Sequence, residues 1–180
     1  GIPESHPASF RNYLRKRLLS KTSIREYYFI HGENNPEEEL ARLNSTISRY
    51  EVDLACIGIG ENGHLAFNDP PADFETEKPF IIVDLDERCK EQQVGEGWFR
   101  SIEEVPDRAI SMSVRRILRS NALVCPVPGE VKADAVHLCF DNEISPLRPA
   151  SILKRHGECL VLLDNESSSK LENEELIDRP

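Results

Sequence analysis

The chain has few basic residues and lacks long apolar runs. It holds 22 Lys and Arg residues against 32 Asp and Glu, which gives a formal net charge of -10. Because clustered Lys and Arg are needed to neutralise phosphates, this balance argues against a nucleic-acid partner and against an anionic membrane surface. No run approaches the roughly 18 residues of a membrane span, and no signal sequence is visible. A small anionic substrate stays open, provided that a few cations converge locally.

Cysteine is also scarce. The five cysteines are an odd number, widely spaced, and contain no CxxC pair. We interpret them as buried free thiols in a reducing compartment, which predicts a cytoplasmic protein without a disulfide framework. The pattern predicts neither a bound metal nor a cofactor. The cysteines are Cys56, Cys89, Cys125, Cys139 and Cys159.

Short apolar runs alternate with amphipathic segments along the chain. Without an internal repeat or a long linker, this order predicts a single α/β domain over residues 1–180 with a largely parallel sheet. Pro126 predicts that its strand lies at an edge or ends early. The acidic tail 165–180 is expected to form a helix that frays. We expect strands at 26–31, 53–59, 80–86, 109–114, 122–127 and 158–164, and helices at 7–20, 36–50, 87–94, 115–121, 130–140 and 150–156.

The segment 58–70, GIGENGHLAFNDP, follows the run 53–59, which has no polar alternation and is expected to be buried on both faces. Ligands in open α/β sheets lie outside the carboxyl ends of strands, where His64 is placed. An imidazole both accepts and gives protons, Asp69 is close enough to fix its tautomer, and Asn68 offers an amide to hydroxyl groups. These residues indicate proton transfer on a polar small molecule. The alternative is a tight glycine turn in which His64 is an ordinary loop residue.

The glycines of this segment also spell GxGxxG, the dinucleotide-binding pattern, with Asp84 about 20 residues further on. In that pattern the third glycine, here Gly63, opens a helix. The run Asn-Asp-Pro-Pro at 68–71 allows at most one helical turn after His64. We therefore expect no dinucleotide.

The same segment closely resembles the GxGxDGHxAFNEP-type signature of the glucosamine-6-phosphate deaminase/isomerase family. GIPESHPASF at 1–10, EVPDRAISMSV at 104–114 and VPGEVKADAV at 127–136 are similar to their family counterparts, so the resemblance covers most of the chain. The related 6-phosphogluconolactonases carry a Ser-Leu-Phe-Pro-like run where this chain has Phe-Asn-Asp-Pro at 67–70, which favours the deaminase side. The resemblance implies a Rossmann-like, three-layer fold with a mostly parallel sheet.

The resemblance further implies that glucosamine 6-phosphate is converted to fructose 6-phosphate and ammonia in amino-sugar catabolism, without a cofactor. His64 matches the family histidine that delivers a proton to the ring oxygen, and Asp69 matches the acidic group that supports it. Asn62 stands where some members have an aspartate, and an amide cannot take up a proton, so support of His64 would rest on Asp69 alone. Lys132 matches the phosphate-binding lysine. We expect further substrate contacts at Gly60, Gly63 and Asn68.

The chain departs from the family pattern in two places. Gln92 or Gln93 stands where the family carries an arginine ligand. The family's Ser-Gly-Gly phosphate loop and the Asp-Glu-Tyr stretch with its C2 base match positions upstream of Gly1, so we expect a fragment or a naturally truncated relative. Two alternatives stay open: a catalytically inactive sugar-phosphate-binding protein and a 6-phosphogluconolactonase-like hydrolase. Truncation would expose a strand edge, which leaves a homo-oligomer open.

Overall fold

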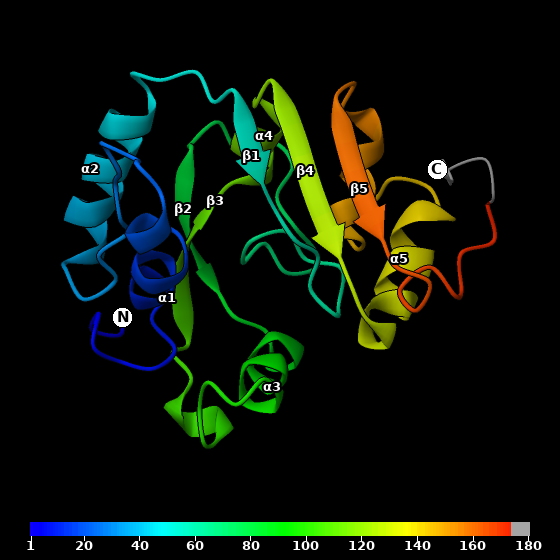
Figure 1. Cartoon of the computed structure of the whole chain (residues 1–180), viewed down its shortest axis with the longest axis horizontal. Coiled ribbons are helices and arrows are strands. Elements are labelled where there is room, and N and C mark those ends of the chain that lie inside the picture. The colour runs from blue at the N-terminus through cyan, green and yellow to red at the C-terminus, as the bar shows by residue number, and fades with distance from the viewer. Residues whose placement is uncertain (174–180) are drawn as a thin grey trace.

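The computed structural model describes residues 1–173 and has a three-stranded parallel sheet at its centre (Figure 1). Its strands are β1 (Leu54–Cys56), β4 (Ala122–Val127) and β5 (Cys159–Leu163), in the order β1-β4-β5. Cys56 is paired with Val124, which is paired with Leu160 on the other side. The predicted α/β class with a parallel main sheet is confirmed.

The other two strands form a separate antiparallel pair. β2 (Phe80–Asp84) and β3 (Arg108–Met112) pair with each other, with Phe80 opposite Met112. The expected strands at 80–86 and 109–114 therefore exist, but they run beside the parallel sheet and do not extend it (Figure 1).

Four of the five described α-helices begin at a polar side chain that accepts a backbone N–H, as at Asn35 and Asp86. The predicted helix at 130–140 is a 3₁₀ turn followed by an α-helix, and the one at 150–156 is entirely 3₁₀. Residues 165–170 form turns, and the end of the predicted fraying tail lies outside the described residues. The helices are α1 (Phe10–Arg17), η1 (Leu19–Lys21), α2 (Pro36–Ile47), α3 (Glu87–Gly95), η2 (Ile102–Glu104), α4 (Val114–Leu118), η3 (Glu130–Lys132), α5 (Ala133–Phe140) and η4 (Pro149–Arg155).

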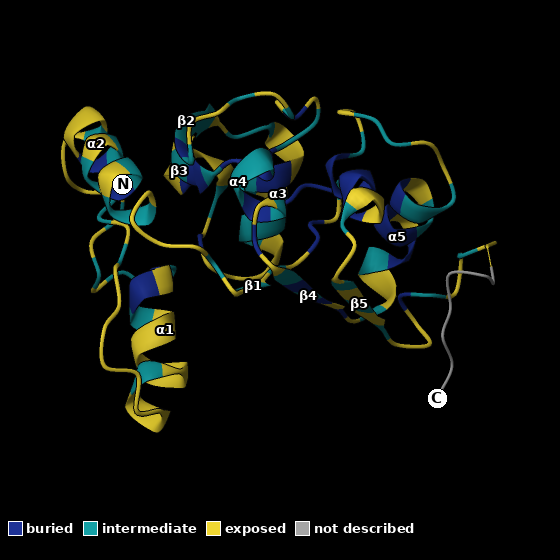
Figure 2. Ribbon diagram, turned by 90° about the horizontal axis from the view of Figure 1, so that it is seen from above, coloured by how far each residue is buried: buried dark blue, intermediate teal, exposed yellow. Residues whose placement is uncertain are grey.

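The parallel sheet is covered on one face. Leu123, Cys125 and Val127 of β4 point into a core shared with α4, α5 and η4, and Figure 2 shows α3, α4 and α5 on the same side of the sheet. The prediction that the run 53–59 is buried on both faces is wrong, because within residues 1–173 no helix covers the opposite face. The exposed apolar side chains there include Leu54, Leu160 and Leu162.

Pro126 lies in the central strand, so the expectation of an edge strand or an early end is wrong. The missing N–H of Pro126 removes no hydrogen bond from the sheet, because the nitrogen faces a side where no strand residue lies opposite it. Leu123 donates toward β5, whereas Val124 accepts from Ile57 on the β1 side. With a period of two, the nitrogen of Pro126 faces the β1 side, beyond the last residue of β1.

The expected strand at 26–31 is absent. This segment has no strand pairing among the described residues, and Tyr27, Tyr28 and Ile30 are exposed. The local apolar pattern indicated a strand, but a strand also needs a hydrogen-bonding neighbour. Phe29 O accepts instead from the Arg42 side chain at 2.6 Å.

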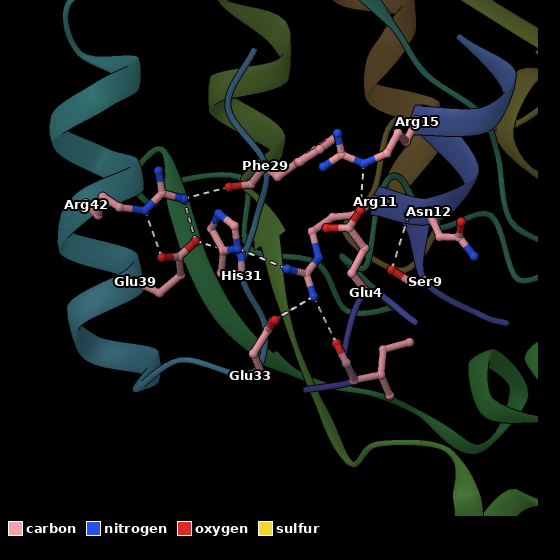
Figure 3. A network of polar contacts seen from close by, with 11 residues as sticks. Glu4, Ser9, Arg11, Asn12, Arg15, Phe29, His31, Glu33, Glu39 and Arg42 are labelled. Atoms are coloured by element: carbon pink, nitrogen blue, oxygen red, sulfur yellow. Dashed lines mark hydrogen bonds and ion pairs between the residues drawn. The ribbon is translucent and has the colours of Figure 1, made fainter. Parts of the chain in front are cut away.

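A partly buried network of charged groups, with Glu39 and Arg11 at its interior, holds this segment against α2 (Figure 3). Glu39 is 1% exposed and accepts from the N–H of His31 at 2.7 Å and from Arg42 Nη2 at 2.6 Å. Arg11 of α1 joins the network through His31 Nδ1 at 2.9 Å and Glu33 at 2.8 Å. Burial would raise the pKa of Glu39, but Arg42 and the His31 N–H together hold it below its usual value.

All five cysteines are free, but the expectation that all five are buried is wrong: Cys89, Cys125 and Cys139 are buried, whereas Cys159 is half-buried. Cys56 is exposed, because it points to the uncovered face of the sheet. None of the described helices is long and apolar enough to cross a membrane.

The charged network generates a test of stability. Replacing Glu39 with Ala (Glu39→Ala) is expected to lower the free energy of unfolding by about 2–3 kcal/mol, because His31 N–H and Arg42 lose a charged acceptor. Since folding lowers the pKa of Glu39, its stabilisation is present above about pH 4.3 and is lost as the pH falls through the folded-state value. Urea unfolding as a function of pH measures both effects. The exposed neighbour Glu38 is the control, and equal losses in Glu38→Ala and Glu39→Ala would contradict the assignment.

Candidate active site

The segment 58–70 folds into a tight loop after β1. Gly60 N–H donates to His64 O at 3.1 Å, and Gly63 N–H donates to Gly60 O at 3.0 Å. Gly63 has φ of 84°, and a Cβ there would lie 3.0 Å from Cys139 Sγ. Both the left-handed backbone and the lack of space therefore require glycine at position 63.

The imidazole of His64 lies directly against the backbone of Gly60. A Cβ on Gly60 would come within 2.2 Å of His64 Cε1 and 2.4 Å of Nε2, so only glycine allows this contact. His64 is buried, with 8% of its surface exposed, and it lines a cavity of about 1490 Å³ together with Gly60 and Phe67. The structure thus shows how Gly60 and Gly63 shape the loop, while their contact with a substrate stays a prediction.

Asp69 is the carboxylate beside His64, as the spacing predicted. Its Oδ1 lies 3.0 Å from His64 Nδ1, although the two groups are not aligned as a hydrogen bond. Burial would raise the pKa of Asp69, but His64, the Asn62 amide and the Asp86 N–H outweigh burial and hold it below its usual value. The carboxylate is therefore ionised near neutral pH and can stabilise a protonated imidazole.

The side chain of Asn62 connects the loop to α3. Its Nδ2 donates to Asp69 Oδ1 at 2.9 Å and to Asp86 Oδ2 at 3.2 Å, and its Oδ1 accepts from His64 N–H at 3.0 Å. Both ends of the amide are thus engaged by protein groups. This geometry favours a positioning part for Asn62.

Asn68 anchors the far end of the loop to β3. It is 3% exposed, and its Nδ2 donates to Leu65 O at 2.7 Å, to Met112 O at 2.8 Å and to Ser111 Oγ at 3.2 Å. The amide donors that the sequence suggested for substrate hydroxyls are therefore engaged by the protein. Contact with a substrate through the remaining carbonyl oxygen stays a prediction.

Lys132 lies at the end of η3 and lines a second cavity of about 640 Å³. Asn62, Arg88 and Gln92 line the same cavity, whereas His64 lines the larger one. Gln92 lines both cavities, and its Oε1 accepts from the loop at 3.2 Å. The structure therefore brings Lys132 near Asn62 but does not place it in one cavity with His64.

Two neighbours of the site were missed by sequence reasoning. Asp86 caps α3 by accepting from the N–H of Cys89 at 2.6 Å, and its own N–H donates to Asp69 Oδ2 at 3.3 Å. Burial and the carboxylates of Asp69 and Asp86 raise the pKa of the Cys89 thiol to about 12. An acidic residue three positions before the cysteine signals a helix start, but it carries no sign that this helix meets the loop.

The fold and the loop together define a class of protein. An α/β protein that holds a buried histidine beside an ionised carboxylate, at a cavity outside the end of a parallel strand, has the arrangement of an enzyme that moves protons on a small molecule. The sequence model of the family described as glucosamine-6-phosphate isomerases/6-phosphogluconolactonase matches residues 1–162. The chain belongs to this family.

Individual relatives agree with this membership. Glucosamine-6-phosphate deaminase of Streptococcus pneumoniae (strain Hungary19A-6) is 32% identical over 173 residues, which is 96% of this chain and 72% of the relative. A monomeric glucosamine-6-phosphate deaminase of known structure is 30% identical, with a TM-score of 0.86 over 94% of this chain and 70% of that one. The 6-phosphogluconolactonase of Thermotoga maritima, 18% identical over 90% of this chain and 67% of its own, has a TM-score of 0.69 and shows the fold alone. These likenesses confirm the Rossmann-like α/β class.

The contact between Gly60 and His64 generates a matched pair of substitutions. Gly60→Ala is expected to displace the imidazole and to lower the free energy of unfolding by about 1–3 kcal/mol, because the new methyl overlaps the ring. Gly58→Ala is the control, since a Cβ at Gly58 meets nothing within 4 Å. The NMR resonances of the His64 ring and urea unfolding report the two effects. An unchanged His64 spectrum in Gly60→Ala would show that the ring does not rest on this glycine.

Proposed function

We propose that the protein containing this chain is a glucosamine-6-phosphate deaminase that converts glucosamine 6-phosphate to fructose 6-phosphate and ammonia. Family membership and the deaminases at 30–32% identity support this reading. The observation that carries it is the buried His64–Asp69 pair, 3.0 Å apart, in a loop that lines the large cavity. A sugar phosphate is therefore the proposed substrate.

His64 is the proposed catalyst of ring opening. Breaking the bond between C1 and the ring oxygen requires a proton on that oxygen and the loss of one from the C1 hydroxyl, and an imidazole performs both transfers. Asp69 stabilises the imidazolium that forms between the two steps. Asn62 keeps both groups in place through its bonds to the Asp69 carboxylate and the His64 N–H.

The isomerisation step moves a proton from C2 to C1, after which water replaces the amino group and ammonia leaves. Asp69 is unsuited to this transfer, because His64 and Asn62 hold its carboxylate. We therefore assign His64 and Asp69 to ring opening only and leave the carbon-to-carbon transfer to another carboxylate. Lys132 is the proposed phosphate contact, supported by its ammonium group and by Arg88 in the same cavity.

We also propose a cytoplasmic location, which the five free thiols support. The exposed leucines on the open face of the sheet support self-association of this chain when it is studied by itself. Sedimentation analysis measures this self-association.

The activity is tested with a coupled assay of ammonia release. His64→Gln is expected to lower kcat by about 10²–10⁴-fold, because ring opening loses its acid and base. Lys132→Gln is the comparison variant and is expected to raise KM more than it lowers kcat, since a phosphate contact contributes to binding. Unchanged turnover in His64→Gln would overturn the assignment. Binding of the sugar phosphate without ammonia release would indicate an inactive binding protein, and hydrolysis of 6-phosphogluconolactone would indicate a lactonase.

Asn62 provides a test by pH dependence. Asn62→Asp replaces a donor to Asp69 and Asp86 with a third negative charge, which raises the pKa of Asp69. Because the ionised Asp69 supports His64, the acid limb of the pH profile of kcat/KM is expected to move to higher pH. Asn142→Asp, at an exposed position, is the control and should leave the profile in place. A profile in Asn62→Asp that matches the parent protein would exclude the proposed support by Asp69.

A further inference from the structure

Three different metal-ligating groups converge at the candidate active site, two of them being its histidine and carboxylate. His64 and Asp69 come from the loop after β1, and Cys89 comes from the first turn of α3. One ligand atom from each residue lies within 4.8 Å of the other two. Within residues 1–173 this is the one group of three or more His, Cys, Asp or Glu side chains with such a geometry.

The three groups are buried, and one of them lacks a well-aligned partner. Cys89 is 1% exposed, and the side chains of His64 and Asp69 are 10% and 6% exposed. His64 Nδ1 makes no hydrogen bond despite its short distance to Asp69. The Asp69 carboxylate is the close partner of this ring nitrogen but is poorly aligned with it, and an incompletely satisfied buried nitrogen is costly in a protein interior. A cation bound at Nδ1 would satisfy it.

The local charge also favours a cation. The Asn62 amide donates to the carboxylates of both Asp69 and Asp86 and so holds two negative charges near each other. Among the ion pairs of residues 1–173, neither Asp69 nor Asp86 pairs with a Lys or Arg. The cluster therefore offers negative charge that no basic side chain compensates.

The first turn of α3 sets the position of the thiol. Asp86 accepts the N–H of Cys89 at 2.6 Å, and the N–H of Asp86 donates to Asp69 Oδ2 at 3.3 Å. The helix cap thus fixes the cysteine relative to the same carboxylate that contacts His64. This connection makes the three ligands a preorganised set and not a chance approach of mobile side chains.

We propose that His64, Asp69 and Cys89 form a site for Zn²⁺. Imidazole, carboxylate and thiolate are the ligands that Zn²⁺ takes, whereas Mg²⁺ and Ca²⁺ prefer oxygen alone. Zinc–ligand lengths of about 2.0–2.3 Å place tetrahedral ligands about 3.3–3.6 Å apart, so ligand atoms that lie up to 4.8 Å apart here must approach by up to about 1.5 Å when the metal binds. The thiol proton leaves to solvent when the Zn–S bond forms, and water fills the fourth position.

Bound Zn²⁺ would occupy the imidazole and the carboxylate assigned to ring opening. It would therefore inhibit turnover, a consequence that rests on the proposed deaminase function. Binding of the metal does not rest on that function, so the two are measured separately. Cys89 gives the site its selectivity for a thiophilic metal over the hard divalent cations.

The test uses Co²⁺ as a spectroscopic substitute and Zn²⁺ itself in equilibrium dialysis. The parent protein is expected to show thiolate-to-cobalt charge-transfer absorption and to bind one Zn²⁺. Loss of an outer-shell partner costs about 10–100-fold in metal affinity, so Cys89→Ala, which removes a ligand, is expected to weaken Zn²⁺ binding by at least about 100-fold. Cys125→Ala, which removes an equally buried thiol from β4, is the matched control and should keep both the absorption and the affinity.

Absence of the charge-transfer absorption in the parent protein, or full Zn²⁺ affinity in Cys89→Ala, would overturn the site. Loss of the absorption in Cys125→Ala would do the same. Circular dichroism checks the fold of each variant, and Cys89→Ser replaces Cys89→Ala if the alanine does not fold. Zn²⁺ inhibition of ammonia release that is relieved in the Cys89 variant would add the functional consequence. A protein that shows the cobalt absorption but releases no ammonia would retain the metal site and lose only the deaminase function.

Discussion

The side-chain amide of Asn62 is the contact on which the geometry of the site depends. It donates to the carboxylates of Asp69 and Asp86 and accepts from the N–H of His64. A carboxylate at this position would have no protons to donate and would repel both neighbours. Asn62 therefore allows two acidic groups and a histidine to lie close together at one end of the loop.

The position of the loop follows from the sheet behind it. β4 continues through Pro126 because the missing N–H points past the end of β1, and its buried face supports the core under the loop. Asn68 then ties the loop to β3 by donating to Ser111 Oγ and to Met112 O. The parallel sheet and the antiparallel pair together fix the two ends of the segment that holds His64.

Sequence reasoning predicted the helices, five of the six expected strands and the pairing of His64 with Asp69, because these depend on local patterns and short spacings. It was wrong at residues 26–31, where the apolar pattern was correct for a strand but no neighbouring strand is present among the described residues. Sequence reasoning also noted that Asn62 replaces an aspartate of some family members and left the support of His64 to Asp69 alone. The contacts of Asn62 include the carboxylate of Asp86, 24 residues further along the chain, which no local pattern encodes.

The sequence by itself determined the family, the loop with its required glycines and the chemical groups of the site. Glycine, histidine and aspartate at fixed spacings restrict the backbone and the proton chemistry wherever the segment lies. Only the tertiary structure decided that the Gly60 backbone supports the His64 ring, that Lys132 lines a different cavity, and that Cys89 joins His64 and Asp69. Lys132 and Cys89 are distant in sequence from the loop and reach it only through the packing of η3 and α3, whereas Gly60 and His64 meet through the folded turn of the loop itself.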